Sequence, residues 1–389
     1  MTEYRALRYD TNQPVRVAAA GGIIESVEPF VGGADLPHIG PGLFDIQING
    51  GWGTEFSSDT LTVEQVRRIF DGVQRTGVTR FCPTLTTNAE STLLSAARTI
   101  AETLGAFPEY EPLVAGLHLE GPFIATADGP RGAHPLKYCR TDYDLGLIDR
   151  LIQASGKRLK IVTLSPEYDG AAAFIRKLTE RGIVVSVGHT NATSEQITEA
   201  SNAGARLSTH LSNGTHPMIP KSGNYFFAEL LNDALQASII ADGFHVSPLT
   251  MNLIRRCKGL ERLILVSDQA QVAGLAPGKY STGLCDLELL PNGKIVLASD
   301  TRLLAAASAP LAAGIVHFCD VSKLPLAEVF PLATTHPARL LNLPAFGNGD
   351  DADFLAVGKP ADFFIFRVQP AGFDFSTIFR CGVSVDLRN

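Results

Sequence analysis

Short runs of apolar residues recur along the middle of the chain, separated by stretches in which apolar positions follow helical spacing. An apolar run of this length, followed by a helical pattern, is typical of a strand that is buried on both faces of a parallel sheet. Eight such runs are present, at residues 43–49, 78–83, 113–120, 159–165, 183–189, 205–210, 237–242 and 263–268. Strands that alternate with helices in this way predict an α/β fold, a (β/α)₈ TIM-like barrel.

The two ends of the chain differ from this pattern. Short strand-like runs at 4–7, 15–20 and 23–27 are broken by proline or glycine, and similar runs occur at 363–366 and 382–387. We expect both ends to form one small β domain, residues 1–40 plus 345–389, beside a barrel domain of residues 41–344. Helical patterns at 62–76 and 194–203, and later at 311–318, 326–333 and 337–341, are expected to form part of the outer ring of the barrel.

Composition narrows the possible partners. The net charge of −7 gives no indication of nucleic-acid or membrane binding, and no stretch reaches the ~18 apolar residues of a membrane span. The six cysteines are scattered without a CxxC pair, which is typical of a reducing compartment. Since the first ten residues also lack the apolar segment of a signal peptide, we expect a cytoplasmic location.

Four of the runs end on a side chain that can bind or assist a metal ion: Glu120, His189, His210 and Asp268. The carboxyl ends of barrel strands form the face on which such folds build active sites. One carboxylate and two imidazoles suit one divalent ion, Zn²⁺ first and Fe²⁺, Co²⁺ or Mn²⁺ as alternatives. Local hydrogen bonding of a buried side chain explains any one of these positions equally well. Three separate strand ends favour a metal site formed by Glu120, His189 and His210.

Asp268 closes the eighth run, after Val266 and Ser267. A carboxylate at this position is suited to take a proton from activated water and pass it to a leaving amine. The alternative is a helix N-cap, since serine and aspartate are favoured caps. Together with the metal ligands, Asp268 predicts a metal-assisted hydrolase.

The first and fourth strands indicate a single ion. The first ends on Gln47 and Asn49, and amides are poor ligands for a divalent ion beside imidazole. The fourth ends Thr163-Leu164-Ser165, without a lysine that could be carbamylated to bridge two ions.

Further histidines are candidates for other roles. His134 lies in a Gly/Pro-rich loop after the third strand, where it could polarise a carbonyl group, and His245 lies similarly after the seventh. A surface histidine explains either position equally well. His118 shares a strand face with Glu120, so we expect it to support the metal site. Structural roles are expected for His38, His317 and His336.

Several motifs together resemble one enzyme family. They are residues 41–50 (PGLFDIQING), 116–123 (GLHLEGPF), 132–134 (GAH), 188–193 (GHTNAT), 209–213 (THLSN) and 241–246 (ADGFHV). Their order along nearly the whole chain resembles the N-acetylglucosamine-6-phosphate deacetylases of the amidohydrolase superfamily. The resemblance implies removal of an N-acetyl group from an amino-sugar phosphate, with release of acetate and the free amine.

The resemblance also implies a role for each motif residue. The predicted metal ligands would hold a single ion, with Asp268 as general acid and base. His134 would polarise the acetyl carbonyl of the amino-sugar substrate. Contacts to the sugar would come from Asn213, Gly214 and His245. Members are commonly homodimers, with the phosphate site close to the subunit interface, so we expect a homodimer.

The chain departs from the family where the phosphate should be held. Members usually run Phe/Tyr-Asn-Ala-Met and then Arg-Glu-Pro-Gly after Thr-His-Leu, whereas residues 212–225 read SNGTHPMIPKSGNY. No arginine occurs between Arg206 and Arg255, and Lys221 is the candidate substitute, although it lacks the bidentate fork of a guanidinium. Two alternatives therefore stay open: a deacetylase of an unphosphorylated N-acetyl amino sugar or other small N-acyl compound, and a non-catalytic relative that binds a sugar.

Overall fold

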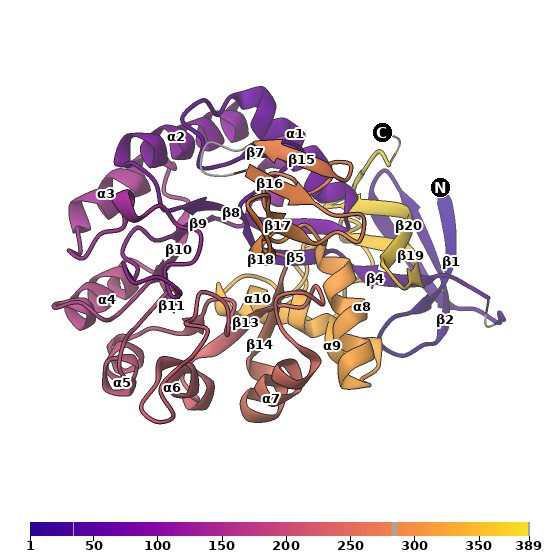
Figure 1. Cartoon of the computed structure of the whole chain (residues 1–389). Helices are drawn as coiled ribbons and strands as arrows, with labels where there is room; N and C mark the ends of the chain where they lie inside the picture. Colours follow the sequence, from indigo (N-terminus) through magenta and orange to yellow (C-terminus); the bar gives the residue numbers. More distant parts are fainter. Residues whose placement is uncertain (34, 282–285, 388–389) are drawn as a thin grey trace.

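The structure is a computed structural model that describes residues 1–33, 35–281 and 286–387. Its central sheet has eight strands in the order β14-β13-β12-β11-β10-β9-β8-β5, and the paired strands run parallel. Neighbours in this sheet are also successive strands of the barrel region, as expected when each crossover returns over a helix. The predicted barrel fold is confirmed (Figure 1).

Each predicted apolar run coincides with one barrel strand. The strands are β5 (Leu43–Ile48), β8 (Val78–Thr86), β9 (Leu117–Glu120), β10 (Leu159–Leu164), β11 (Val184–Val187), β12 (Leu207–Ser208), β13 (Gln236–Ile240) and β14 (Leu263–Val266). Six of the predicted runs extend beyond the carboxyl ends of the observed strands, and the runs 183–189, 205–210 and 263–268 do so by two residues and end on a site residue. These three strands end early because His189, His210 and Asp268 have positive φ angles of 49°, 31° and 50°, which extended strands do not adopt.

The ring of strands closes between β5 and β14. The backbone amide of Asp268 donates to the carbonyl of Gln47 at 3.0 Å. One layer deeper, the backbone amide of Ser267 donates to Asp45 Oδ2 at 3.1 Å. The Asp45 side chain is buried, and burial raises its pKa to about 7. These contacts tie the end of the first strand to the segment that carries Asp268.

Helices cover the outside of the barrel (Figure 1). In α1 (Val63–Arg75), Thr62 and Gln65 form a capping box, and apolar residues three or four apart are buried. The helix α5 (Ser194–Ala203), which follows β11, begins with the same kind of box. The others are α2 (Glu90–Ala106), α3 (Leu145–Ala154), α4 (Ala171–Glu180), α6 (Tyr225–Leu231), α7 (Pro248–Lys258), α8 (Leu311–Ser322), α9 (Leu326–Val329) and α10 (Thr335–Leu340). Within the described ranges, none has the length and apolar character needed to cross a membrane.

The two ends of the chain form a separate sheet of seven strands in the order β21-β20-β19-β4-β1-β2-β3. Its strands are β1 (Thr2–Arg8), β2 (Pro14–Ala20), β3 (Ile23–Pro29), β4 (His38–Pro41), β19 (Phe363–Gln369), β20 (Gly372–Arg380) and β21 (Val383–Ser384). Strand β4 pairs with both β1 and β19, so it joins the two ends. The sheet has its own apolar core, which includes Val17, Ile39 and Phe363. The small β domain built from both termini is confirmed, while its boundaries at residues 40 and 345 stay a prediction.

Within the terminal sheet, β4 and β20 were not among the predicted runs, and two β elements outside that sheet were not predicted either. A hairpin of β6 (Gly50–Gly51) and β7 (Thr54–Glu55) follows the first barrel strand. A four-stranded antiparallel sheet follows β14 and consists of β15 (Gly278–Ser281), β16 (Asp286–Leu289), β17 (Ile295–Leu297) and β18 (Asp300–Ala306). Both elements contribute side chains to the cavity at the mouth of the barrel.

Candidate metal-dependent active site

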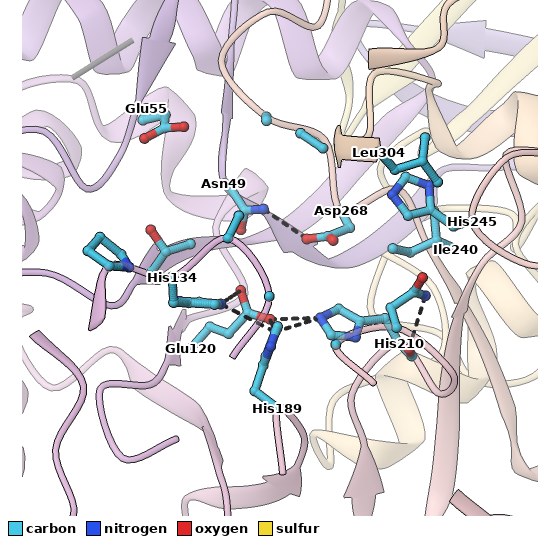
Figure 2. A pocket seen from close by; sticks show the side chains of 18 residues that line it. Asn49, Glu55, Glu120, His134, His189, His210, Ile240, His245, Asp268 and Leu304 are labelled. Atoms are coloured by element: carbon cyan, nitrogen blue, oxygen red, sulfur yellow. Dashed lines mark hydrogen bonds and ion pairs between the residues drawn. The ribbon is translucent and has the colours of Figure 1, made fainter. Parts of the chain in front are cut away.

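A cavity of about 300 Å³ lies where the carboxyl ends of the barrel strands converge (Figure 2). Most of the residues predicted for the site line it: Glu120, His134, His189, His210, Asn213, Gly214, His245 and Asp268. The barrel therefore brings together groups that are widely separated in sequence. The remaining predicted residue, Lys221, is exposed and is not among the residues that line the cavity.

Four buried side chains form a cluster at the base of this cavity. Glu120 Oε1 lies 2.9 Å from His210 Nε2 and 3.2 Å from His189 Nε2, and the two Nε2 atoms are 3.2 Å apart. His134 Nε2 lies 3.3 Å from His189 Nε2 and 3.9 Å from Glu120 Oε2. Glu120, His134 and His189 offer ligand atoms that all lie within 4.8 Å of one another. The tightest triangle is nevertheless Glu120, His189 and His210, the set predicted from the sequence.

The hydrogen bonds of His189 show which of its ring nitrogens is available to the cluster. His189 Nδ1 lies 2.9 Å from the Pro130 carbonyl oxygen, which can only accept, so Nδ1 carries a proton and Nε2 is the nitrogen that presents a lone pair when the ring is neutral. That lone pair faces the carboxylate oxygen of Glu120, another acceptor. Donor atoms around a tetrahedral Zn²⁺ lie roughly 3.3 Å apart, given bonds of about 2.0–2.1 Å. The donor set therefore fits a divalent cation.

The charges of the cluster support the same conclusion. Burial would raise the pKa of Glu120, but hydrogen bonds and charge from His189 and His210 hold that pKa well below its usual range. Glu120 is therefore an anionic group in a buried position. Gln47 Nε2 donates to Glu120 Oε1 at 2.9 Å, which orients the carboxylate. Burial, with the charge of His189, lowers the pKa of His134 to about 3, so His134 is a neutral imidazole.

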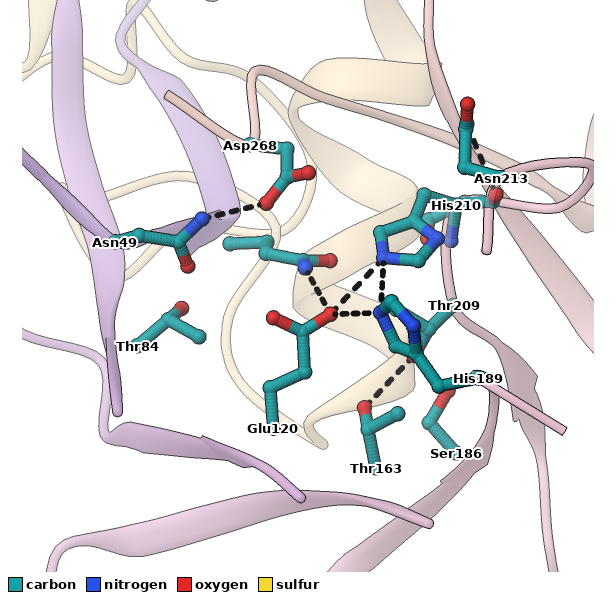
Figure 3. Close-up of polar contacts among 12 residues, drawn as sticks. Asn49, Thr84, Glu120, Thr163, Ser186, His189, Thr209, His210, Asn213 and Asp268 are labelled. Carbon is teal, nitrogen blue, oxygen red and sulfur yellow. Dashed lines mark hydrogen bonds and ion pairs between the residues drawn. The ribbon is translucent and has the colours of Figure 1, made fainter. Parts of the chain in front are cut away.

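His189, His210 and Asp268 share an uncommon backbone conformation, with φ angles of 49°, 31° and 50°. A non-glycine residue in such a region costs roughly 1–3 kcal/mol and persists only where its surroundings hold it. Each of the three lies within two residues of the end of its strand. The turn ends the strand, and the side chains of His189 and His210 then point toward Glu120 (Figure 3).

Asp268 lies beside the cluster and is oriented by an amide. Asn49 Nδ2 donates to Asp268 Oδ1 at 2.8 Å (Figure 3). Burial raises the pKa of Asp268 to about 6, and the charge of Glu120 adds to the shift. A carboxyl group with a pKa near neutrality can both accept and return a proton. The helix N-cap alternative for Asp268 is not supported, because residues 269–275 form a bridge and turns rather than a helix.

Contacts between residues of the same loop fix the conformation of the loop that carries His134. Arg131 Nη1 donates to the His134 carbonyl oxygen at 2.9 Å, and its other terminal nitrogen pairs with Asp128. Gly132 has a φ of 59°, and a Cβ at this position would lie 3.2 Å from His189 Cε1. A larger residue would therefore be strained and would press on the cluster. The loop places His134 in the buried cluster, 3.3 Å from His189 and beside the groups predicted to bind the metal.

The residues predicted to contact a sugar form another part of the wall. Asn213 Nδ2 donates to the His210 carbonyl oxygen at 3.1 Å. A Cβ on Gly214 would lie only 2.6 Å from His189 Nδ1, so no other residue fits there without displacing the ring. His245 Nδ1 lies 2.7 Å from Asp242 Oδ2, a contact that orients its imidazole.

Several residues that line the cavity were missed by sequence reasoning, among them Glu55, Leu304 and Ala306. Leu304 and Ala306 lie on β18, whose sheet was not predicted. Glu55 follows a Gly-rich segment, and nothing in its local sequence marks it as a cavity residue. Among the described residues that line the cavity there is no lysine or arginine, and the carboxylates are Glu55, Glu120 and Asp268.

A parallel barrel with a carboxylate, histidines and an aspartate at its strand ends is the arrangement of the amidohydrolases, enzymes that hydrolyse amide and related bonds. The model of the Amidohydrolase family matches residues 39–382, a range that contains every residue of the site. Within this class, the chain belongs to the N-acetylglucosamine-6-phosphate deacetylase family, as its motifs predicted.

The relatives support this assignment over most of their length. N-acetylglucosamine-6-phosphate deacetylase from Danio rerio is 33% identical over 332 residues, which are 82% of this chain and 80% of the relative. N-acetylgalactosamine-6-phosphate deacetylase from Escherichia coli O157:H7 is 31% identical over 328 residues, 83% of this chain and 84% of the relative. The structure of N-acetyl-D-glucosamine-6-phosphate deacetylase from Mycobacterium smegmatis is similar with a TM-score of 0.82 at 28% identity, covering 99% of this chain and all of that one.

The chain is therefore a hydrolase that acts on an amide bond, and the family together with the clustered ligand atoms indicates a single divalent metal. The alternative of a non-catalytic sugar-binding relative is not supported.

Proposed function

We propose that this protein hydrolyses the N-acetyl group of an N-acetylhexosamine 6-phosphate, with N-acetylglucosamine-6-phosphate as the first candidate, to give the amine and acetate. The observation that carries the proposal is the convergence of five groups on one cavity: Glu120, His134, His189, His210 and Asp268. The relatives share this reaction but differ in the named sugar, glucosamine or galactosamine. The configuration of the hexosamine is therefore part of the test.

Each group of the cluster has a place in this reaction. Glu120, His189 and His210 would hold the divalent ion, Zn²⁺ in the first place, which when bound supplies the positive charge that makes a water molecule more acidic. Asp268 takes a proton from the attacking water and delivers it to the departing nitrogen, so that water is divided between acetate and amine. His134 donates a hydrogen bond to the acetyl oxygen as negative charge develops there. Asn213, Gly214 and His245 contact the sugar.

The lining of the cavity has few groups that could bind the phosphate of the substrate. A phosphate monoester carries nearly two negative charges and is normally held by guanidinium, ammonium or several backbone donors. The described lining residues include no cationic lysine or arginine, but they include Glu55. This observation favours the second candidate, a deacetylase of an unphosphorylated N-acetyl amino sugar or another small N-acyl compound.

Acetate release separates these candidates. Purified protein with a measured metal content would be mixed with N-acetylglucosamine-6-phosphate, N-acetylgalactosamine-6-phosphate and N-acetylglucosamine, and kcat/KM would be compared. The proposal expects metal-dependent acetate release, with the highest kcat/KM on a 6-phosphate. A higher kcat/KM on the unphosphorylated sugar would establish the second candidate. No acetate from any of the three by metal-replete protein would contradict the proposal.

Lys221 provides a sharper test of phosphate recognition. If its ammonium reaches the phosphate from the loop after β12 or from a second subunit, Lys221→Ala should raise KM for the phosphorylated sugar by roughly 10-fold, since a hydrogen bond to a charged group is worth about 1.5–3 kcal/mol. KM for the unphosphorylated sugar should stay nearly unchanged. Lys177→Ala is the matched control, because Lys177 is an exposed lysine on α4. A strong preference for the 6-phosphate that survives Lys221→Ala would assign phosphate binding to another group.

A homodimer and a cytoplasmic location are the remaining parts of the proposal, and both rest on the family resemblance and composition. Light scattering on the purified protein tests the first, since a dimer has twice the 41.6 kDa of one chain.

A further inference from the structure

A row of polar side chains lies inside the barrel beneath the metal cluster. Its members are His118 on β9, Thr163 on β10, Ser186 on β11 and Thr209, which follows β12. All four residues are buried, and the exposed fraction of each is at most 2%. In Figure 3, Thr163 and Ser186 are visible below the ring of His189, and Thr209 lies beside that ring. None of these four residues lines the cavity, and none has a role in the proposed reaction.

These side chains form one continuous hydrogen-bonded network. His118 Nδ1 lies 3.0 Å from the Ile46 carbonyl oxygen, and His118 Nε2 lies 2.7 Å from Thr163 Oγ1. Thr163 Oγ1 lies 2.7 Å from Thr209 Oγ1, which lies 2.5 Å from Ser186 Oγ. The network spans the barrel from the first strand to the sixth.

The direction of each bond follows from its neighbours. The Ile46 carbonyl can only accept, so His118 Nδ1 donates to it, and Nε2 of the neutral ring accepts from Thr163. Thr163 in turn accepts from Thr209, and Thr209 accepts from Ser186. Every hydroxyl therefore donates once, and a loss at one position leaves a buried partner unsatisfied.

The network touches the backbone next to each proposed metal ligand. Thr163 is in register with Glu120, and its carbonyl accepts from the Gly121 amide at 3.0 Å. Thr209 directly precedes His210. A Cβ on Gly188, the residue before His189, would lie 2.9 Å from Thr209 Cβ and 3.0 Å from Thr163 Cγ2.

These contacts are adjacent to the strained part of the site. His189 and His210 have φ angles of 49° and 31°, a conformation that persists only where surrounding structure holds it. Gly188, which precedes His189, packs against the network, and Thr209, which precedes His210, is a member of it. On β9, the strand that carries Glu120, His118 lies two residues before Glu120 and on the same face.

We propose that this buried network of His118, Thr163, Thr209 and Ser186 positions Glu120, His189 and His210 for metal binding, so that its loss weakens the metal site before it unfolds the barrel. These are positioning residues, since none of them touches the substrate or the ion. The inference rests on the proposed metal ligands. The competing explanation is that the network only satisfies buried polar groups and contributes to general stability.

Thr163→Val separates these explanations because it removes the central hydroxyl and keeps the size and branching of the side chain. Thr163→Ser restores the hydroxyl. Thr103→Val is the matched control, since Thr103 is a fully buried threonine of α2 whose hydroxyl donates to the Thr99 carbonyl at 2.8 Å. The measurements are the Kd for Zn²⁺ by competition with a chelator, and the Tm of each metal-free protein.

We expect Thr163→Val to raise the Kd for Zn²⁺ roughly 10–100-fold, the usual effect of losing a group that supports metal ligands. Thr163→Ser and Thr103→Val should bind Zn²⁺ as the wild type does, even if Thr103→Val lowers the Tm as much as Thr163→Val does. A Thr163→Val protein with a lowered Tm and an unchanged Kd would overturn the proposal. So would an equal rise in Kd in Thr103→Val.

A second variant decides the matter if Thr163→Val does not fold. Ser186→Ala removes the terminal hydroxyl of the network, and it should raise the Kd in the same direction by a smaller factor. An unchanged Kd in a folded Ser186→Ala protein would overturn the proposal. The wild-type measurement comes first: absence of stoichiometric Zn²⁺ there would overturn the proposed ligands, and the role of the network with them, before any variant is compared.

Discussion

Replacing His189 with alanine is expected to remove both the bound metal and the deacetylase activity. His189 Nε2 contacts Glu120 Oε1 and His210 Nε2, each at 3.2 Å. Its removal leaves two ligands instead of three, so we expect the Kd for the metal to rise by more than ~100-fold, beyond the effect of losing a supporting group. Activity should fall to the background of the assay. Metal content by elemental analysis and acetate release measure the two effects.

Two further variants make this result specific. His189→Asn also lacks the imidazole, but asparagine tolerates the positive φ of 49° found at this position. It should lose the metal as His189→Ala does, which would exclude backbone strain as the cause. His38→Ala removes a histidine of the terminal sheet and should keep both metal and activity. A fully metallated and active His189→Ala protein would rule out the proposed ligand set.

Asp268→Asn is expected to keep the metal and to lose activity by ~10²-fold or more, the usual scale for a general acid–base group. Asparagine has the size of aspartate and accepts the positive φ of 50° at this position, but its amide cannot take a proton from water. Metal content therefore separates this variant from His189→Ala. Asp320→Asn, at an exposed position on α8, is the control and should behave as wild type.

The pH dependence of the wild type gives an independent check. Burial raises the pKa of Asp268 to about 6 in the absence of a cation, and a nearby divalent ion lowers it by favouring the carboxylate. The base form is needed for proton transfer, so kcat/KM should rise with pH through a pKa at or below about 6 and then level off. Asp268→Asn should lose this acidic limb. Normal turnover in Asp268→Asn would transfer the role to another group, with His134 the next candidate.

Much of the barrel could be read from local patterns. Strands that are buried on both faces are mostly apolar, so each one leaves a nearly continuous apolar run that stands out from the helices around it. The same runs show which polar groups stand at strand ends, and this was enough to predict Glu120, His189, His210 and Asp268. Lys221 was chosen for a different reason, the absence of arginine from its segment, and the structure places it outside the cavity lining.

The elements that were missed have weaker signals. In β16 buried and exposed residues alternate over only four positions, and in β20 a similar alternation includes polar residues on a partly exposed face. An alternation this short or this interrupted is a weak strand signal, because a period of two is recognised only over several successive positions. Glu55 reaches the cavity from β7, and Leu304 and Ala306 reach it from β18, which are elements that were also not predicted.

The sequence by itself determined which residues are buried and which end the strands, because the free energy of burying a side chain depends mainly on its own chemistry and on the period of its secondary structure. Only the tertiary structure decided that these ends meet. Closure between β5 and β14, the positive φ angles of His189, His210 and Asp268, and the hydrogen bonds through Thr163 depend on the relative position of strands far apart in the chain. Distances of about 3 Å between their polar atoms arise from the ring as a whole, and no single segment encodes them.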